Sequence, residues 1–341
     1  MKKRKGAQIF GIIVLILVII LVAILGGTYW FIQNKLSKLQ RIDLKSEELG
    51  ISSAAEASLG GYRNIAIFGV DSRNNNLDRG NRSDCIMIAS MNNQTKEVKL
   101  ISVYRDTYVQ IEGHGLDKIT HAYSYGSAPL AISTLNTNLD LNIKEFVTVN
   151  FDAVAQAVDK LGGVTIEIES EEELKYLNNY IDETAKVTGK SNEKVAAIGK
   201  QTLNGVQAVA YSRIRYTEGG DYKRAERMRM VIEAMAEKLK TKNISEINSF
   251  IDFILPKVYT NITASDVFSL LPSVTSFKIT DSIGWPYETK GITLDRWYGV
   301  PVTLESNVSR LHQEAFGEEY TPSEVVKTIS NHIIEKTKYN R

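Results

Sequence analysis

The sequence has few of the side chains that build disulfides and zinc sites. Cys85 is the single cysteine among 341 residues, so no disulfide can form within the chain and no cysteine-based metal site is available. No two of the four histidines are spaced as zinc ligands are; they are His114, His121, His312 and His332. These absences exclude a disulfide scaffold and argue against zinc chemistry.

An excess of charge of one sign is also missing. The chain has 41 lysines and arginines against 40 aspartates and glutamates, which gives a formal net charge of +1 at pH 7. A nearly neutral protein has no overall electrostatic attraction to nucleic acid, so we expect no nucleic-acid partner. Because 43% of the residues are hydrophobic, the chain can form a core, and its length suits one large domain or two small ones.

Two common kinds of catalytic motif are absent. Residues 188–191 read TGKS, which resembles the end of a P-loop, but Thr184 stands where that motif needs glycine and no predicted strand leads into it. The sequence contains no G-x-S-x-G and no convincing cysteine–histidine arrangement. These absences argue against a P-loop nucleotide hydrolase and against a serine or cysteine hydrolase.

The N-terminal region predicts a membrane anchor. The chain begins MKKRK and then carries no charge from Gly6 to Asn34, with a dense apolar stretch over residues 9–25. Such a stretch can cross about 30 Å of hydrocarbon as a helix, and it exceeds the roughly 7–15 apolar residues of a cleaved signal peptide, which is the alternative. We therefore favour a retained anchor over a cleaved signal.

The charge around this anchor predicts its orientation. The basic start gives a cytoplasmic tail over residues 1–8, a transmembrane helix over 9–32 and an extracellular remainder. A single-pass cell-membrane protein with a large external domain and no disulfides suits a Gram-positive type of envelope.

The rest of the chain is predicted to form one layered domain. Residues 33–61 are polar and alanine-rich and indicate an extracellular stem, and residues 321–341 indicate a polar C-terminal helix or tail. Between them, residues 62–320 alternate β-like runs such as NIAIFGV with segments of helical periodicity such as 152–161. This alternation predicts an α/β fold, an α/β/α layered domain around a central mixed sheet.

The stretch Gly69–Asp106 places charged side chains at the ends of three apolar, β-like runs. Asp71 follows the first run, Arg82 and Asp84 flank the start of the second, and Arg105 follows the third. Charges at the edge of a sheet are costly to desolvate unless they are paired. Their partners could be each other, or a metal and an anionic ligand.

A second group of arginines lies further along the chain. Arg213 and Arg215 are two apart in a segment predicted to be extended, so their side chains are expected on one face. Arg224 and Arg227 share a face of the following helix, for which Asp221 is a candidate cap. Several guanidiniums together can hold a diphosphate, because each binds phosphate oxygens in pairs.

The two aspartates of the first group suit a divalent ion. Magnesium is commonly held by one or two carboxylates together with substrate phosphates, and Asp71 and Asp84 could supply the carboxylates. The alternative for any single arginine is a weak salt bridge on a solvated rim. For the whole set, gathered at two turns, we favour a binding site.

At these residues the chain resembles the LytR-CpsA-Psr family of membrane-anchored cell-wall phosphotransferases. The resemblance covers residues from about Asn64 to Leu239 and rests on several separate motifs in one order. The matching stretches read GVDSR, RSD, YRDTYVQI, DKITHAYSYG, FVTVNFDAV, LGGVTIEI, LNGVQAVAYSRIRY and GDYKRAERM.

The resemblance implies a long hydrophobic cavity for a polyprenyl chain. It also implies magnesium-dependent transfer of a glycopolymer (teichoic acid, capsule or a related polysaccharide) from a polyprenyl-diphosphate carrier to a peptidoglycan hydroxyl. Asp71 and Asp84 are then the expected magnesium ligands. The expected diphosphate ligands are Arg82, Arg105, Arg213, Arg215, Arg224 and Arg227. The expected catalytic residues are Asp71, Arg82, Asp84, Arg105 and Asp221.

Some assignments stay open at this point. The base for the incoming hydroxyl is not singled out, and Asp106 and Asp221 are candidates. The chain departs from the family pattern at Tyr104, where proline is frequent, and at Met228, where glutamine often follows Arg227. We expect the first departure to alter a local turn, and Met228 is left out of the site. The alternative functions are a non-catalytic polyprenyl-diphosphate-binding regulator of envelope assembly and a lipid diphosphatase.

Overall fold

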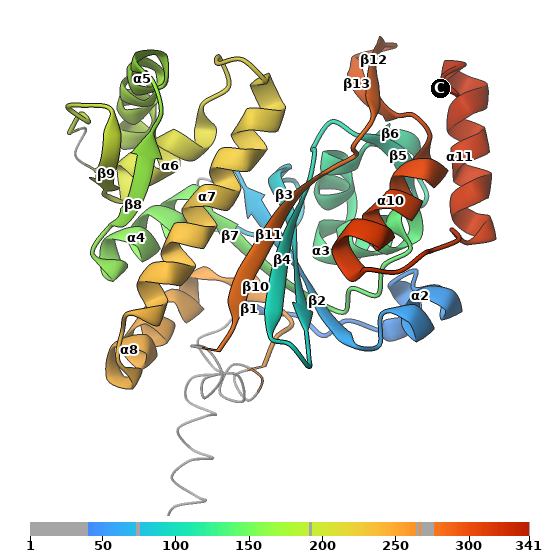
Figure 1. Cartoon of the computed structure of the whole chain (residues 1–341), viewed down its shortest axis with the longest axis horizontal. Helices are drawn as coiled ribbons and strands as arrows, with labels where there is room; N and C mark the ends of the chain where they lie inside the picture. The colour runs from blue at the N-terminus through green and yellow to red at the C-terminus, as the bar shows by residue number, and fades with distance from the viewer. Residues whose placement is uncertain (1–39, 73–75, 191–192, 264–265, 267–275, 341) are drawn as a thin grey trace, which may run out of the picture.

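The structure is a computed structural model that describes residues 40–72, 76–190, 193–263, 266 and 276–340. Within these ranges, a seven-stranded sheet in the order β1-β10-β7-β2-β3-β4-β11 forms the centre of the molecule (Figure 1). Its strands are β1 (Gln40–Arg41), β2 (Tyr62–Val70), β3 (Ser83–Asn92), β4 (Glu97–Val103), β7 (Glu145–Asn150), β10 (Tyr259–Thr260) and β11 (Lys278–Trp285).

The predicted mixed sheet is confirmed, and its strand directions create one edge rich in strand ends. β2 runs parallel to β7, and β4 runs parallel to β11. β3 runs antiparallel to both β2 and β4. The carboxyl ends of β2, β4, β7 and β11 therefore meet the start of β3. We call this the carboxyl edge; the carboxyl ends of strands are where open α/β sheets usually bind ligands.

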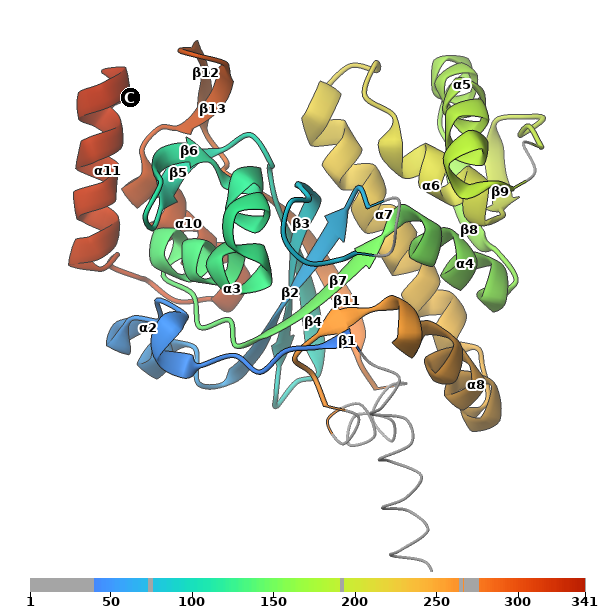
Figure 2. The ribbon, with the colours of Figure 1, turned by 180° about the vertical axis from the view of Figure 1, so that it is seen from behind.

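Helices cover both faces of the sheet, as Figures 1 and 2 show, so the α/β layering is confirmed. One face packs against α2 (Ser53–Ser58), α3 (Ile119–Leu139), α10 (Leu304–Phe316) and α11 (Glu324–Thr337). On the other face lie α4 (Phe151–Leu161), α5 (Glu171–Thr188), α6 (Gly205–Arg213), α7 (Gly220–Lys240) and α8 (Ile244–Ile254).

The remaining elements form small additions to these layers. Three two-stranded sheets occur in the described part of the chain. They are β5 (Tyr108–Ile111) with β6 (Gly115–Lys118), β8 (Val164–Ile168) with β9 (Gly199–Leu203), and β12 (Thr289–Thr293) with β13 (Trp297–Pro301). Two single turns of 3-10 helix are η1 (Ser46–Glu48) and η2 (Leu255–Lys257).

Local sequence explains why the elements next to the carboxyl edge form. Side chains of β2 alternate between fully and partly buried, as expected for a strand between two helical layers. The helix α4 starts directly after β7, because the Asn150 side chain accepts a hydrogen bond from the backbone N–H of Ala153. It ends at Gly162, whose φ of 85° lies in the left-handed region that favours glycine.

The described part of the expected stem and the expected C-terminal helix both pack into the main core. The expected stem contributes β1, η1 and α2 to the domain, and Leu49, Ala55 and Leu59 are buried in the main core. The expected C-terminal helix or tail forms α11, which buries Val326 and Ile333 in the same core. Both segments contain few apolar residues, and these residues contact distant parts of the chain. The sequence pattern of each segment therefore does not reveal its packing.

The predicted transmembrane helix over 9–32 lies outside the described residues. Among the residues that are described, no helix is both long and apolar enough to cross a membrane.

Candidate functional site

A small cavity lined by charged and aromatic side chains opens at the carboxyl edge. Its volume is about 290 Å³. We call it the ionic cavity. Its lining consists of Asp71, Asp84, Phe151, Tyr180, Glu183, Arg213, Arg215, Tyr216, Arg224 and Met228. The structure thus brings together five of the residues that the sequence predicted, from four separate segments.

Asp84 is the best-connected carboxylate of the ionic cavity. One of its oxygens accepts a hydrogen bond from Nη1 of Arg105, and the other lies 3.8 Å from Nη2 of Arg215. Asp71 directly follows β2 and is exposed. Burial opposes the charge on Arg105, but the attraction of Asp84, Asp106 and other nearby carboxylates outweighs it and raises the pKa of Arg105. Arg105 therefore stays charged beside the cavity although it does not line it.

Arg224 is nearly enclosed, with 3% of its side chain exposed. It donates to the backbone carbonyl of Asp84 at 3.1 Å and to the Asp221 carboxylate at 3.2 Å. Burial lowers the pKa of Arg224, and the attraction of Asp221 offsets part of this effect. Asp221 also lies 3.8 Å from Nε of Arg215. Asp221 therefore holds two lining arginines, although it is not part of the lining itself.

Asp221 does not cap α7 as predicted. The N-cap is Gly219, which has a φ of 87° and no side chain, and Asp221 lies inside the first turn. A carboxylate in that turn still interacts favourably with the helix dipole, but here its partners are arginine side chains.

Arg213 reaches the cavity from a helix and not from the predicted extended segment, because α6 ends at this residue. Its guanidinium pairs with Glu183 at 2.7 Å and donates to the Thr184 hydroxyl at 3.1 Å. It also lies over the rings of Phe151 and Tyr180, 5.4 and 5.8 Å from their centroids. This arrangement fixes the orientation of the guanidinium before any ligand binds.

Three predicted diphosphate ligands are not in the lining: Arg105, described above, Arg227 and Arg82. Arg227 is buried, and its Nε lies 2.7 Å from Glu173, with only 2% and 3% of the two side chains exposed. It also donates to the Thr217 hydroxyl at 2.9 Å. Arg82 is exposed and lies outside the cavity lining. Arg227 thus forms a buried ion pair beneath the site, while Arg82 flanks the site.

The candidate bases differ in their surroundings. Asp106 lies 2.7 Å from Nζ of Lys118 and 3.6 Å from Nε of Arg105. Asp221 lies between Arg215 and Arg224 and is about one-third exposed. Asp221 therefore adjoins the ionic cavity directly, whereas Asp106 is held by its cationic neighbours.

Sequence reasoning missed several lining residues. Tyr180 and Glu183 lie three apart on α5, so their shared face could be inferred, but not that this face turns toward α6. Phe151 and Met228 resemble ordinary core residues in the sequence. Met228 was left out of the site, yet the structure places it in the lining.

The charges of the ionic cavity balance. Arg213, Arg215 and Arg224 face Asp71, Asp84 and Glu183 in its lining. A diphosphate that binds the guanidiniums would leave carboxylates without partners, and a divalent cation would compensate them. Among the described residues, no group of three or more histidine, cysteine, aspartate and glutamate side chains is arranged to hold a metal ion. Two carboxylates in a cavity that a diphosphate could enter are nevertheless compatible with magnesium, which needs few protein ligands.

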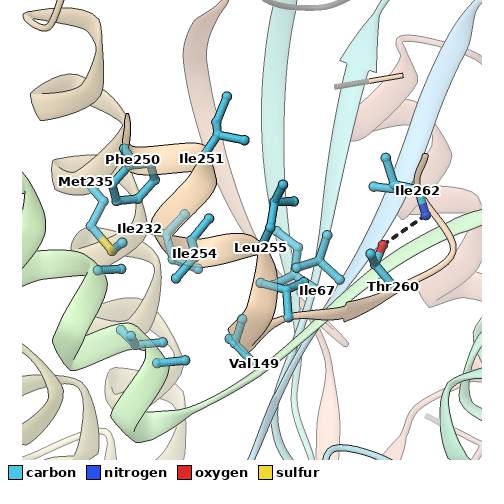
Figure 3. A pocket seen from close by; sticks show the side chains of 15 residues that line it. Ile67, Val149, Ile232, Met235, Phe250, Ile251, Ile254, Leu255, Thr260 and Ile262 are labelled. Atoms are coloured by element: carbon cyan, nitrogen blue, oxygen red, sulfur yellow. Dashed lines mark hydrogen bonds between the residues drawn. The ribbon is translucent and has the colours of Figure 1, made fainter. Parts of the chain in front are cut away.

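A second pocket of about 360 Å³ lies between some of the same helices and is almost entirely apolar (Figure 3). We call it the apolar pocket. It lies between β2, β7, α4, α7 and α8, and the side chains that Figure 3 labels include Ile67, Val149, Ile232, Met235, Phe250 and Ile254. Thr260 adds a hydroxyl, which accepts from the backbone N–H of Ile262 at 3.0 Å and donates to the carbonyl of Phe146. Its polar atom is therefore satisfied within the protein.

Two helices connect the apolar pocket to the ionic cavity. Met228 and Ile232 are one turn apart on α7, and they line the ionic cavity and the apolar pocket respectively. Phe151 and Val154 have the same relation on α4. The two spaces therefore lie about one helical turn apart along both helices.

Comparison with known proteins gives a consistent result. The model of the LytR_cpsA_psr family matches residues 29–297. A curated relative from Bacillus subtilis (strain 168), the polyisoprenyl-teichoic acid–peptidoglycan teichoic acid transferase TagT, is 31% identical over 275 residues, covering 78% of this chain and 82% of the relative.

Solved structures share the fold. The crystal structure of B. subtilis TagT matches with a TM-score of 0.62 and 26% identity over 81% of this chain and 100% of that one. A second match is the structure of the LytR-CPS2A-psr family protein YwtF (TagT) with bound octaprenyl pyrophosphate lipid. Its TM-score is 0.57 at 23% identity, and the match covers 87% of this chain and 99% of that chain. At that identity the second match speaks for the fold alone.

Proposed function

Because the chain belongs to the LytR-CpsA-Psr family, we propose that it transfers a glycopolymer from a polyprenyl-diphosphate carrier to a peptidoglycan hydroxyl. The observation that carries this proposal is that α4 and α7 each contribute residues to both the ionic cavity and the apolar pocket. A polyprenyl diphosphate has the same two parts, a polyanionic head and a hydrocarbon chain. The B. subtilis relative is a polyisoprenyl-teichoic acid–peptidoglycan teichoic acid transferase, which supports the same reaction.

The apolar pocket would hold the polyprenyl chain. Each buried methylene group contributes about 0.8 kcal/mol, so even part of a long prenyl chain binds strongly in a dry pocket. The satisfied hydroxyl of Thr260 means that the chain would leave no polar group of that side chain unpaired.

The ionic cavity would hold the diphosphate. Arg213, Arg215 and Arg224 line it, and Arg105 lies behind Asp84. Planar guanidiniums already fixed by protein partners can stabilise negative charge on phosphoryl oxygens without reorganising during the reaction. We assign Arg227 a positioning role, because its pair with Glu173 connects α7 to α5 beneath the cavity.

The proposed reaction is a phosphoryl transfer. The acceptor hydroxyl oxygen attacks the phosphorus next to the glycopolymer, and the bond from that phosphorus to the bridging oxygen breaks. Polyprenyl phosphate leaves, and the polymer is joined to peptidoglycan through a phosphodiester. Asp221, which adjoins the cavity, is the proposed acceptor of the hydroxyl proton.

Magnesium is the proposed cofactor. Asp71 and Asp84 would hold it together with phosphate oxygens, and when bound it would neutralise charge on the diphosphate. The protein itself would orient the diphosphate head with its arginines and keep the polyprenyl chain away from water. We also propose that the domain lies outside the cell membrane, anchored by the basic-then-apolar N-terminal sequence.

A transfer assay tests the proposal. The full chain in detergent micelles would be mixed with a synthetic polyprenyl-diphosphate-linked saccharide, peptidoglycan oligomers and magnesium. We expect a saccharide–peptidoglycan product that disappears with EDTA and in Asp84→Asn, but not in the matched exposed-carboxylate control Asp43→Asn. Release of the saccharide to the same extent with and without peptidoglycan oligomers would indicate a diphosphatase. Tight donor binding with no product in either arm would overturn the enzyme assignment.

A further inference from the structure

An open cleft of about 730 Å³ lies at the carboxyl edge and has no role in the chemistry proposed so far. We call it the tyrosine cleft. Its volume lies within the range of roughly 300–1,000 Å³ that ligand-binding pockets occupy. Among the residues that line the tyrosine cleft are Tyr104, Tyr222, Tyr287, Glu288 and Thr289.

Two tyrosine rings form one wall of the tyrosine cleft. Tyr104 and Tyr222 meet edge to face, with ring centroids 4.4 Å apart and planes at 87°. The Tyr222 hydroxyl lies 2.6 Å from the Thr289 hydroxyl. This hydrogen bond holds the Tyr222 ring in place, although 42% of the residue is exposed. A fixed, exposed aromatic ring beside hydroxyl and carboxylate groups is a common composition for a polar-ligand site.

The wall depends on a glycine contributed by a distant strand. A Cβ atom on Gly284, in β11, would lie 2.0 Å from the Tyr104 hydroxyl oxygen. Only glycine therefore leaves room for the Tyr104 side chain in this position. The sequence had led us to expect that Tyr104 alters a local turn; the structure shows that it also lines the cleft.

The tyrosine cleft and the ionic cavity are neighbours along the carboxyl edge. Tyr104 directly precedes Arg105 at the end of β4, and Tyr222 directly follows Asp221 on α7. In the sheet order, β4 and β11 lie on one side of β3, while β2 and β7, which form the floor of the apolar pocket, lie on the other. The head-group site therefore has the apolar pocket on one side and the tyrosine cleft on the other.

We propose that the tyrosine cleft binds the glycan strand of the acceptor. This inference rests on the proposed transfer reaction and adds the location of its second substrate. Sugars present an apolar C–H face, which suits the Tyr222 ring, and a rim of hydroxyls, which suits Glu288 and Thr289. A strand in the cleft lies next to Asp221, the proposed proton acceptor, and on the side away from the lipid.

The test separates acceptor binding from donor binding and from turnover. Soluble peptidoglycan glycan fragments would be titrated onto the full chain in micelles, and the KM for the same fragments would be measured in the transfer assay. We expect Tyr222→Ala to raise both the dissociation constant and KM about tenfold, the size of a truncated binding anchor. Donor binding should stay unchanged.

The matched control is Tyr125→Ala, since Tyr125 is 40% exposed but lies outside the cleft. Thermal unfolding would establish that each variant folds. Unchanged fragment binding in Tyr222→Ala, or an equal loss in Tyr125→Ala, would overturn the cleft assignment even if transfer proceeds. Fragment binding that needs Tyr222 in a protein that shows no transfer would support the cleft and overturn the proposed reaction instead.

Discussion

The ionic cavity and the apolar pocket share two helices but differ in almost every other respect. Three arginines and three carboxylates line the ionic cavity, where Arg213 pairs with Glu183 and Arg215 lies 3.8 Å from Asp84. In the apolar pocket, aliphatic side chains leave a space that the fold does not fill. Along α7 the change from one to the other occurs between Arg224 and Ile232, with Met228 between them. One helix therefore presents a charged cavity and an apolar pocket at positions two turns apart.

The largest effect is expected from removing an arginine at the charged end. Arg215→Ala should reduce kcat/KM for transfer by about 10⁴-fold, because Arg215 lines the ionic cavity and a guanidinium that stabilises phosphoryl charge contributes about 10³–10⁵-fold in related chemistry. Arg215→Lys should recover only part, since lysine cannot bind phosphate oxygens in a bidentate manner. Steady-state kinetics with Arg41→Ala as an exposed-arginine control measures this. A tenfold or smaller loss would break the assignment of catalysis to the ionic cavity.

The second effect concerns stability and separates Arg227 from the arginines of the lining. Arg227→Met should lower the free energy of unfolding by about 3 kcal/mol, because it leaves Glu173 charged, buried and unpaired. Glu173→Leu in the same chain should restore much of that loss. Urea unfolding of the single and double variants measures it. If Arg227→Met is stable and loses donor binding instead, Arg227 belongs with the ionic cavity after all.

The third effect tests the apolar end alone. Met235→Glu places a carboxylate in the apolar pocket and should weaken binding of a long-chain polyprenyl diphosphate about 10–100-fold, as expected for the loss of one or two buried apolar groups. Binding of a short, water-soluble prenyl diphosphate should not change, and Met235→Leu is the matched control. Equal losses for both donors would show that the two regions do not divide head and chain between them.

The smallest effect is a pH dependence of the free energy of unfolding. It comes from Cys85, which follows Asp84 on β3. The half-buried Cys85 thiol packs among apolar side chains, and desolvation raises its pKa from 9.0 to about 11. The folded protein therefore holds this proton longer than the unfolded chain does. Its contribution to stability is complete below pH 9.0 and falls as the pH rises toward about 11.

Two measurements check this pH dependence. Thiol-reactive reagents should label native Cys85 slowly at pH 8, and Cys85→Ala should remove part of the loss of stability between pH 9 and 11. Rapid labelling of the native protein at pH 8 would show that the polar environment of the ionic cavity extends beneath Asp84.

Much of the fold could be predicted from the sequence. Apolar alternation in runs such as NIAIFGV is a local property, so β2, β3, β4 and β7 were found close to their observed bounds. The same holds for α4, whose apolar residues repeat with helical period. The sequence predicts a stem over residues 33–61 and misses the packing of residues 40–61, because the few apolar side chains that dock them are recognisable only when their distant partners are known.

The candidate site was predicted in part for the same physical reason. Charge at the ends of apolar runs marked Asp71, Asp84 and Arg105, since a strand end lies at a sheet edge whatever the topology. Which arginines face a ligand depended on packing. Arg224 and Arg227 share a helix face, yet one lines the cavity and the other is buried against Glu173 on α5.

The sequence by itself therefore determined the elements, the charged strand ends and the family motifs, because each depends on residues close together in the chain. Only the tertiary structure decided which of these residues meet. It placed Met228 at the boundary of the charged and apolar spaces, and it let Tyr104 and Tyr222 form one wall because Gly284 leaves room. Those contacts join segments more than fifty residues apart, and no local pattern encodes them.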